Sequence, residues 1–97
     1  MATYVVLANL TDQGASTMQD LARRLENARE TFKAHGAELK QIYFAMGQYD
    51  YVVVAEAPDD EAITRVALAV SSQGNVRTNT FRVFSEQEAL SLVEDIR

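Results

Sequence analysis

The stretch of sequence that decides the fold is Met46-Gly47-Gln48-Tyr49-Asp50-Tyr51-Val52-Val53-Val54. A two-residue type II′ hairpin loop needs glycine at its first position, where φ is positive, so Gly47-Gln48 predicts a hairpin corner. The tyrosines and valines that follow form an aromatic and β-branched run, which is typical of a strand buried on both faces. The sequence therefore predicts a tight hairpin followed by a central strand over residues 49–57.

Three other segments have the pattern of strands. Residues 3–10, Thr-Tyr-Val-Val-Leu-Ala-Asn-Leu, are as apolar as the stretch above and predict a second central strand. Residues 37–46 are interrupted by Glu38 and Lys40, and residues 76–84 are polar at several positions. Charged and polar side chains protect unpaired backbone, so we expect these two strands at the edges of the sheet.

A first helix is predicted between residues 16 and 35. Ser16 and Gln19 have the spacing of a capping box, and Gly36 suits the left-handed position just after a helix. Apolar residues recur at helical spacing within this segment, which leaves Arg23 and Arg24 for solvent. The predicted inner face consists of Met18, Leu21, Ala22, Leu25, Ala28 and Phe32.

Two more helices complete the chain. Pro58 ends the third strand, Asp59 is the expected N-cap of a second helix, and Ser85 and Glu88 form a capping box that opens a last one. The order strand, helix, strand, strand, helix, strand is that of the α+β ferredoxin-like βαββαβ fold with a four-stranded antiparallel sheet, here followed by a C-terminal helix. In that topology the first and third strands lie in the middle, where the most apolar segments belong.

The composition excludes several functional classes. A chain of 97 residues predicts a single domain over residues 1–97. Its formal net charge of −5 opposes binding to nucleic acids and to anionic membranes. With no cysteine and one histidine, a transition-metal site is not expected. We see neither a signal peptide nor an apolar run of about 20 residues that would span a bilayer, and we expect a cytoplasmic protein without a cofactor.

The sheet is expected to need a partner. Both helices of this topology cover the same face and leave the other open. Alternation places Tyr4 and Val6 on one side of the first strand and Val5 and Leu7 on the other, so neither face is polar. We therefore expect a homodimer or higher oligomer, in which two sheets pack as a dimeric α/β barrel with room for a small organic ligand.

Tyr49 and Asp50 are the candidate catalytic residues. An acid beside a tyrosine at the mouth of a cleft has the groups needed to move protons or to orient a hydroxyl. The same spacing also fits a structural interpretation, in which Gly47 makes the turn and Asp50 binds a backbone group. The sequence leaves both interpretations open.

Candidate ligand-binding residues come from the strands around the expected cavity. Tyrosine offers a large rigid surface with a polar tip, and arginine can pair with a carboxylate. Strand alternation places Arg77 and Arg82 on opposite faces, so at most one points into a given cavity. His35 lies at a helix end and is interpreted as a cap. The candidates are Tyr4, Val6, Asn9, Tyr51, Arg77 and Arg82.

Three blocks of the chain resemble the GYD-domain family. They are Tyr4-Val5-Val6-Leu7-Ala8-Asn9-Leu10-Thr11-Asp12-Gln13-Gly14, Gly47-Gln48-Tyr49-Asp50-Tyr51-Val52-Val53-Val54 and Ser72-Gln73-Gly74-Asn75-Val76-Arg77-Thr78. The resemblance covers nearly the whole chain and implies a dimeric α/β barrel. That broad fold group includes cofactor-free monooxygenases, muconolactone-isomerase-like proteins and stress-responsive barrels, so the resemblance constrains the architecture more than the reaction.

The sequence predicts that the chain binds a small, partly apolar organic ligand beside the central strands. One alternative is an enzyme of the cofactor-free monooxygenase or isomerase kind. Another is an amino-acid-sensing module or a purely structural oligomerisation module. The RNA-recognition motif shares the strand order, but the basic residue and second glycine of that motif are missing and the net charge is wrong for RNA.

Overall fold

A computed structural model describes residues 1–96 of the chain. The elements follow one another as β1 (Ala2–Leu10), α1 (Asp12–Ser16), a 3₁₀ turn (Met18–Asp20), α2 (Leu21–Ala34), β2 (Glu38–Phe44), β3 (Tyr51–Ala57), α3 (Asp60–Ser71), β4 (Val76–Val83) and α4 (Glu86–Glu94). Within the described residues, no helix is long and apolar enough to cross a membrane.

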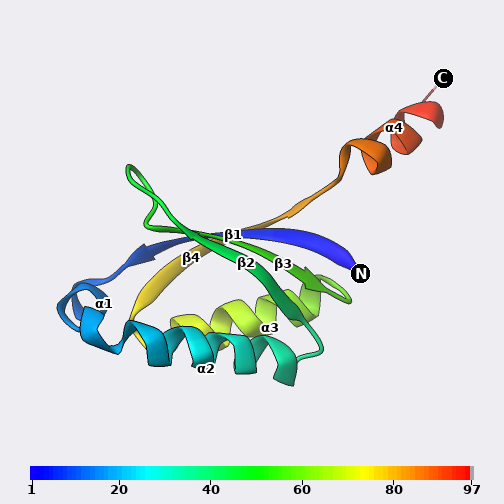
Figure 1. Cartoon of the computed structure of the whole chain (residues 1–97). Coiled ribbons are helices and arrows are strands. Elements are labelled where there is room, and N and C mark those ends of the chain that lie inside the picture. Colours follow the sequence, from blue (N-terminus) through cyan, green and yellow to red (C-terminus); the bar gives the residue numbers. More distant parts are fainter. Residues whose placement is uncertain (97) are drawn as a thin grey trace.

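The four strands form one antiparallel sheet in the order β2-β3-β1-β4. The two most apolar strands, β1 and β3, are therefore the central pair, which confirms the ferredoxin-like arrangement predicted from the sequence. Helices α2 and α3 lie side by side against one face of the sheet (Figure 1). The opposite face, called the open face below, is covered by neither helix.

Alternate residues of the central strands divide between the two faces. Tyr4 and Val6 of β1 and Val53 of β3 are buried beneath the helices, where they meet Phe32 and Val66. The residues between them in sequence point to the open face and form an apolar cluster. This open-face cluster consists of the half-buried Val5, Leu7, Val52 and Val54 and the exposed Tyr43 and Phe81.

The connection between β2 and β3 is wider than the two-residue hairpin that the sequence predicts. Phe44 pairs with Tyr51, and the backbone N–H of Ala45 donates to the carbonyl oxygen of Asp50 at 2.8 Å, so residues 46–49 form the loop. Gly47 has φ +105°, as its expected turn role requires. The prediction of a two-residue loop is wrong, because the Asp50 carboxylate accepts a hydrogen bond from β1. The rings of Phe44 and Tyr51 also pack edge to face, with their centres 5.0 Å apart.

The first long helix also begins later than predicted. Ser16 and Gln19 do not form a capping box, because the Ser16 hydroxyl donates instead to the carbonyl oxygen of Gln13 at 3.0 Å. The N-cap of the short helix α1 is Thr11, whose hydroxyl oxygen accepts the N–H of Gly14, and α2 starts only at Leu21. The end of α2 is as expected, with Gly36 at φ +73° directly after the C-cap residue.

The C-terminal helix α4 projects away from the rest of the molecule (Figure 1). It starts at the predicted capping box, in which Ser85 and Glu88 exchange two hydrogen bonds of 2.9 and 3.0 Å. Hydrogen bonding from Ser85, above all from its backbone N–H to the Glu88 carboxylate, also lowers the pKa of Glu88, because it stabilises the ionised form. The apolar side chains of this region are more than half exposed, namely Leu90, Leu92, Val93 and Ile96.

Tyr4 links the first strand to α3. Its side chain is almost completely buried, and its hydroxyl donates a hydrogen bond to the carboxylate of Asp60. Burial and the Asp60 carboxylate together raise the pKa of Tyr4 to about 12, from 10.0. The hydroxyl is therefore a structural donor at neutral pH.

The Tyr4 contact predicts a pH-dependent stability. The phenol ionises near pH 10 in the unfolded chain but near pH 12 in the folded chain, so its contribution to stability is complete below pH 10 and is lost as the pH rises towards 12. We expect the urea midpoint of the native chain to fall more steeply across this window than that of Tyr4→Phe. Tyr43→Phe, at an exposed tyrosine, should keep the native profile. Parallel profiles for Tyr4→Phe and the native chain would contradict the contact.

Candidate functional site

Three segments that are far apart in sequence meet at the end of β1. The backbone N–H of Thr11 donates to the carbonyl oxygen of Asn75 at 3.0 Å, and the Thr11 hydroxyl donates to the carbonyl oxygen of Gly74 at 2.6 Å. Asp50 joins them from the loop before β3. We call this meeting point, formed by residues 11–14, Asp50 and residues 73–75, the loop junction.

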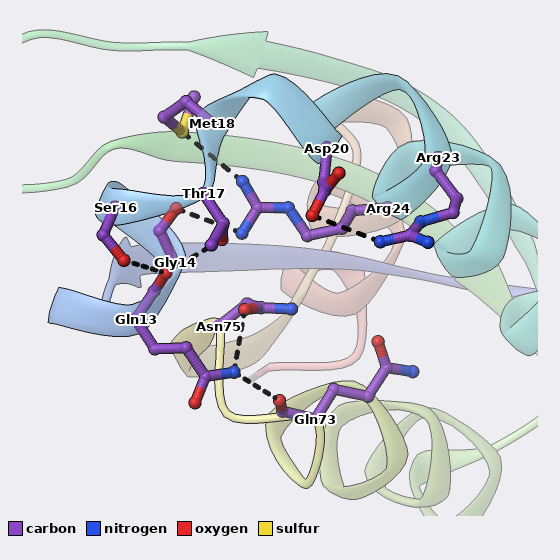
Figure 2. A network of polar contacts seen from close by, with 10 residues as sticks. All are labelled: Gln13, Gly14, Ser16, Thr17, Met18, Asp20, Arg23, Arg24, Gln73 and Asn75. Atoms are coloured by element: carbon purple, nitrogen blue, oxygen red, sulfur yellow. Dashed lines mark hydrogen bonds and ion pairs between the residues drawn. The ribbon is translucent and has the colours of Figure 1, made fainter.

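The side of the loop junction formed by α1 depends on a very close approach. A Cβ atom added to Gly14 would lie 2.1 Å from the carbonyl oxygen of Asn75. Only glycine, which has no side chain, therefore fits this position in the helix. Next to it, the Gln13 amide nitrogen donates to the Gln73 carbonyl and to the Asn75 side chain, both at 3.1 Å (Figure 2). The start of α1 and the turn before β4 therefore form one rigid unit.

Asp50 holds the third segment to the end of β1. Its carboxylate accepts the backbone N–H of Leu10 at 2.8 Å, and its own N–H donates to the carbonyl oxygen of Ala8 at 3.0 Å. The side chain thus takes the place of a backbone acceptor where the pairing of β1 with β3 ends. This is the backbone contact that the structural interpretation of Asp50 expects; a catalytic role for Asp50 and Tyr49 stays a prediction.

A cavity of about 90 Å³ lies between the sheet and helices α2 and α3, next to the loop junction. Its walls are apolar side chains from both layers, among them Val6, Val53, Ala28 and Val66. At the end towards the loop junction the lining becomes polar. The polar side chains there are Arg24, Gln73, Asn75 and Thr78.

Arg24 reaches into this polar end from α2. One terminal nitrogen of its guanidinium donates to the carbonyl oxygen of Gly14 at 3.1 Å, and the other lies 3.4 Å from the sulfur of Met18 (Figure 2). Its Nε is buried without a hydrogen-bond partner among the described residues. The prediction that Arg24 faces solvent is therefore wrong. The sequence carries a signal for this inward position, because Arg24 lies three residues after Leu21 and four before Ala28, which are both on the inner face.

Tyr51 also lines the cavity. Its side chain is 7% exposed. Burial raises the pKa of Tyr51; the Arg24 charge opposes this rise and the Asp50 carboxylate adds to it. The phenol is therefore neutral at physiological pH and is available to donate a hydrogen bond.

The other residues predicted for the site are divided between two faces and two ends of the sheet. Arg77 pairs with Asn9 near the loop junction but on the open face, whereas Arg82 pairs with Tyr4 at the far end, where its guanidinium lies 4.7 Å from the centre of the Phe84 ring. The expected placement of the two arginines on opposite faces is confirmed by this register. Val6 and Tyr51 line the cavity.

Sequence reasoning missed most of the polar residues at the loop junction. The contacts that Thr11, Gln13, Gln73 and Asn75 make across the junction could not be read from local spacing. Within residues 1–96, no group of three or more histidine, aspartate or glutamate side chains is arranged to hold a metal ion.

Comparison with known proteins identifies the family. The GYD domain matches residues 4–93. A Thermus thermophilus protein named glutamine synthetase and cystathionine beta-lyase binding protein is 36% identical over 81 residues, which cover 82% of this chain and 85% of the relative. The chain belongs to the GYD-domain family.

Solved structures confirm the fold. A feast or famine regulatory protein from Mycobacterium tuberculosis, complexed with L-methionine, superimposes with a TM-score of 0.66 at 20% identity over 88% of this chain, which spans 51% of the regulator. The chain thus corresponds to about half of that protein. A second Thermus thermophilus protein, TTHA0845, gives a TM-score of 0.56 at 23% identity over 88% of this chain and 95% of its own.

The Asp50 contact predicts a loss of stability on substitution. Asp50→Ala leaves the Leu10 N–H without its charged acceptor, so we expect the free energy of unfolding to fall by about 1 to 3 kcal/mol. Asp50→Asn keeps an acceptor oxygen and should lose less. Asp12→Ala, in the nearby exposed first turn of α1, should change the free energy of unfolding by less than about 1 kcal/mol. Urea unfolding measures all three, and a native-like Asp50→Ala would contradict the structural role.

Proposed function

We propose that this GYD-domain protein binds a small, partly apolar organic molecule in the cavity beside its central strands. The observation that carries the proposal is the cavity of about 90 Å³ with apolar walls and one polar end. A single water needs roughly 10 to 15 Å³ of such space, so the cavity has room for a molecule of roughly six to nine non-hydrogen atoms. Apolar walls with a few fixed polar groups are the usual composition of small-molecule sites.

Two observations support binding over catalysis. The Asp50 carboxylate is already bonded to the Leu10 backbone, which limits its use as a base. Neither Asp50 nor Tyr49 is among the described side chains that line the cavity. A cofactor-free monooxygenase or isomerase using these two residues therefore remains the alternative with less support.

Amino-acid sensing is an alternative of the binding class. The regulator crystallised with L-methionine shares the fold of this chain at 20% identity. That likeness concerns the fold, so the choice between an amino acid and another small molecule rests on the groups that line the cavity.

The ligand-binding proposal is tested by filling the cavity. Ala28 of α2 lines the cavity and Ala22 of the same helix is exposed, so Ala28→Leu and Ala22→Leu add the same atoms inside and outside. Four probes with one branched tail serve as ligands: 4-methylpentanoate, 4-methylpentanamide, 4-methylpentan-1-ol and leucine. We expect calorimetry to detect at least one of them with the native chain and with Ala22→Leu, and Ala28→Leu to weaken it at least about tenfold. Binding of none, or equal binding to both variants, would reject the cavity as a ligand site.

The second part of the proposal is that two copies associate through the open face. Four strands of about seven residues present roughly 450 Å² of flat surface. A stable dimer buries about 800 Å² on each partner, so the sheet supplies around half of the required area. The exposed apolar side chains of α4, including Leu92 and Val93, extend the surface from the end of β4. The open-face cluster and α4 together therefore fit a second copy of the chain.

Binding of another protein is the second candidate for the open face. The Thermus thermophilus relative, 36% identical, is named for binding glutamine synthetase and cystathionine beta-lyase. An equivalent role here would use the same exposed apolar residues, with an enzyme in place of the second copy.

Sedimentation equilibrium distinguishes these two occupants. We expect a dimer at micromolar concentration, and a monomer for Phe81→Glu, which places a charge in the open-face cluster. Thr64→Glu, on the exposed side of α3, should remain dimeric. A monomeric native chain would contradict self-association. Capture of purified glutamine synthetase or cystathionine beta-lyase by that monomer, lost in Phe81→Glu, would support the second candidate.

A further inference from the structure

The ionisable groups around the cavity are unevenly distributed. Among the described side chains that line it, Arg24 is the one cation, and none is a carboxylate. Tyr51 contributes a neutral phenol, and the remaining polar side chains, Gln73, Asn75 and Thr78, are uncharged. The polar end of the cavity therefore carries one positive charge.

The Arg24 charge is not neutralised by an ion pair with a described residue. Its terminal nitrogens contact the Gly14 carbonyl oxygen and the Met18 sulfur, both uncharged, and its Nε is buried without a partner. Asp20, one helical turn before Arg24 in the sequence, pairs instead with Arg23 at 3.2 Å (Figure 2). A buried donor of a charged group without an acceptor is unfavourable, and an anion within hydrogen-bond reach of Nε would remove this cost.

The chemistry of the site selects the kind of anion. A carboxylate matches the planar fork of a guanidinium, and a single cation balances a single negative charge. The apolar wall formed by Val6, Val53 and Val66 suits a short hydrocarbon chain. An α-amino acid would also bring an ammonium group into a cavity whose described side chains offer no carboxylate to receive it.

We propose that the cavity takes a small monocarboxylate with a short apolar chain, with Arg24 as the counter-ion and Tyr51 as a neutral donor, and that it discriminates against the matching α-amino acid. This inference rests on the proposed function, because it names the ligand class for the same cavity. It places the site in the organic-acid class and separates it from amino-acid sensing.

Calorimetric titration of the native chain with three matched probes tests the ligand class. The probes are 4-methylpentanoate, 4-methylpentanamide and leucine, which share one branched tail and differ in their polar groups. Because charge-assisted hydrogen bonds are the stronger ones, we expect the carboxylate to bind at least about tenfold more tightly than the amide. Leucine should bind more weakly than the carboxylate by a similar factor. An amide or leucine that binds as tightly as the carboxylate would overturn the inference.

Variants at two neighbouring arginines test the role of Arg24. Arg24→Gln should bring the affinities for carboxylate and amide within about threefold of each other, because the charge that distinguishes them is gone. Arg23→Gln, at an exposed arginine on the same helix, should keep the native preference. Arg24→Lys retains the charge and should retain part of the preference. An unchanged preference in Arg24→Gln would overturn the assignment.

Failure of this inference is distinguishable from failure of the proposed function. Binding of the amide or of leucine that is as tight as that of the carboxylate, and is lost in Ala28→Leu, would preserve the ligand cavity and reject the carboxylate class. Binding of none of the probes would reject both. The comparison of probes uses the native chain, so the ligand class is decided even where an Arg24 variant does not fold.

Discussion

Two hydrogen bonds at adjacent residues hold the end of β1, and the candidate site depends on them. The N–H of Leu10 bonds to the Asp50 carboxylate, and the N–H of Thr11 bonds to the Asn75 carbonyl oxygen. Together they join segments that lie about forty and sixty residues away along the chain. The absence of a side chain on Gly14 allows α1 to come close enough for this arrangement. Because Arg24 bonds to the Gly14 carbonyl oxygen, the same junction also places the single cation of the cavity.

Each central strand contributes side chains to both faces of the sheet, and the two faces suit different kinds of binding partner. In β1, Val6 faces the cavity beneath the helices, while Val5 and Leu7 face the open side of the sheet. The helix-covered surface contains a partly open cavity with one charged end, which suits a small molecule. The open surface is broad and apolar, and α4 carries further exposed apolar side chains, which suits a macromolecular partner. Ligand binding and association therefore require different residues of the same strands and can be tested separately.

Much of the fold was predictable because its signals are local. The valine run after Tyr51 and the apolar residues 3–10 identify the central strands, since only buried strands tolerate such continuous apolarity. The capping box at Ser85 and the left-handed Gly36 fix helix ends through contacts within a few residues. These features depend on the sequence immediately around them, so a single sequence is enough to find them.

The candidate site was less predictable because its contacts are distant. The hydrogen bond from the Leu10 N–H to the Asp50 carboxylate widens the hairpin loop, and no local pattern indicates a bond between those two positions. Thr11 caps α1, so the capping-box spacing at Ser16 was misleading. Arg24 has the sequence pattern of a surface residue, and its inward position follows from the hydrogen bond that its guanidinium donates to the Gly14 carbonyl oxygen of α1. A charged residue at the border of an apolar helix face can point either way, and the tertiary contacts decide its direction.

Amide hydrogen exchange at residues 10 and 11 tests whether the two hydrogen bonds hold the end of β1. If the loop junction is the rigid unit described above, the amides of Leu10 and Thr11 should exchange at least about 100-fold more slowly than in an unstructured chain, because both hydrogen bonds must break before exchange. The amide of Gly47, in the exposed β2–β3 loop, provides the internal reference for fast exchange. Protection of Leu10 and Thr11 well above that of Gly47 is the predicted result. Exchange of all three amides at similar rates would contradict the account.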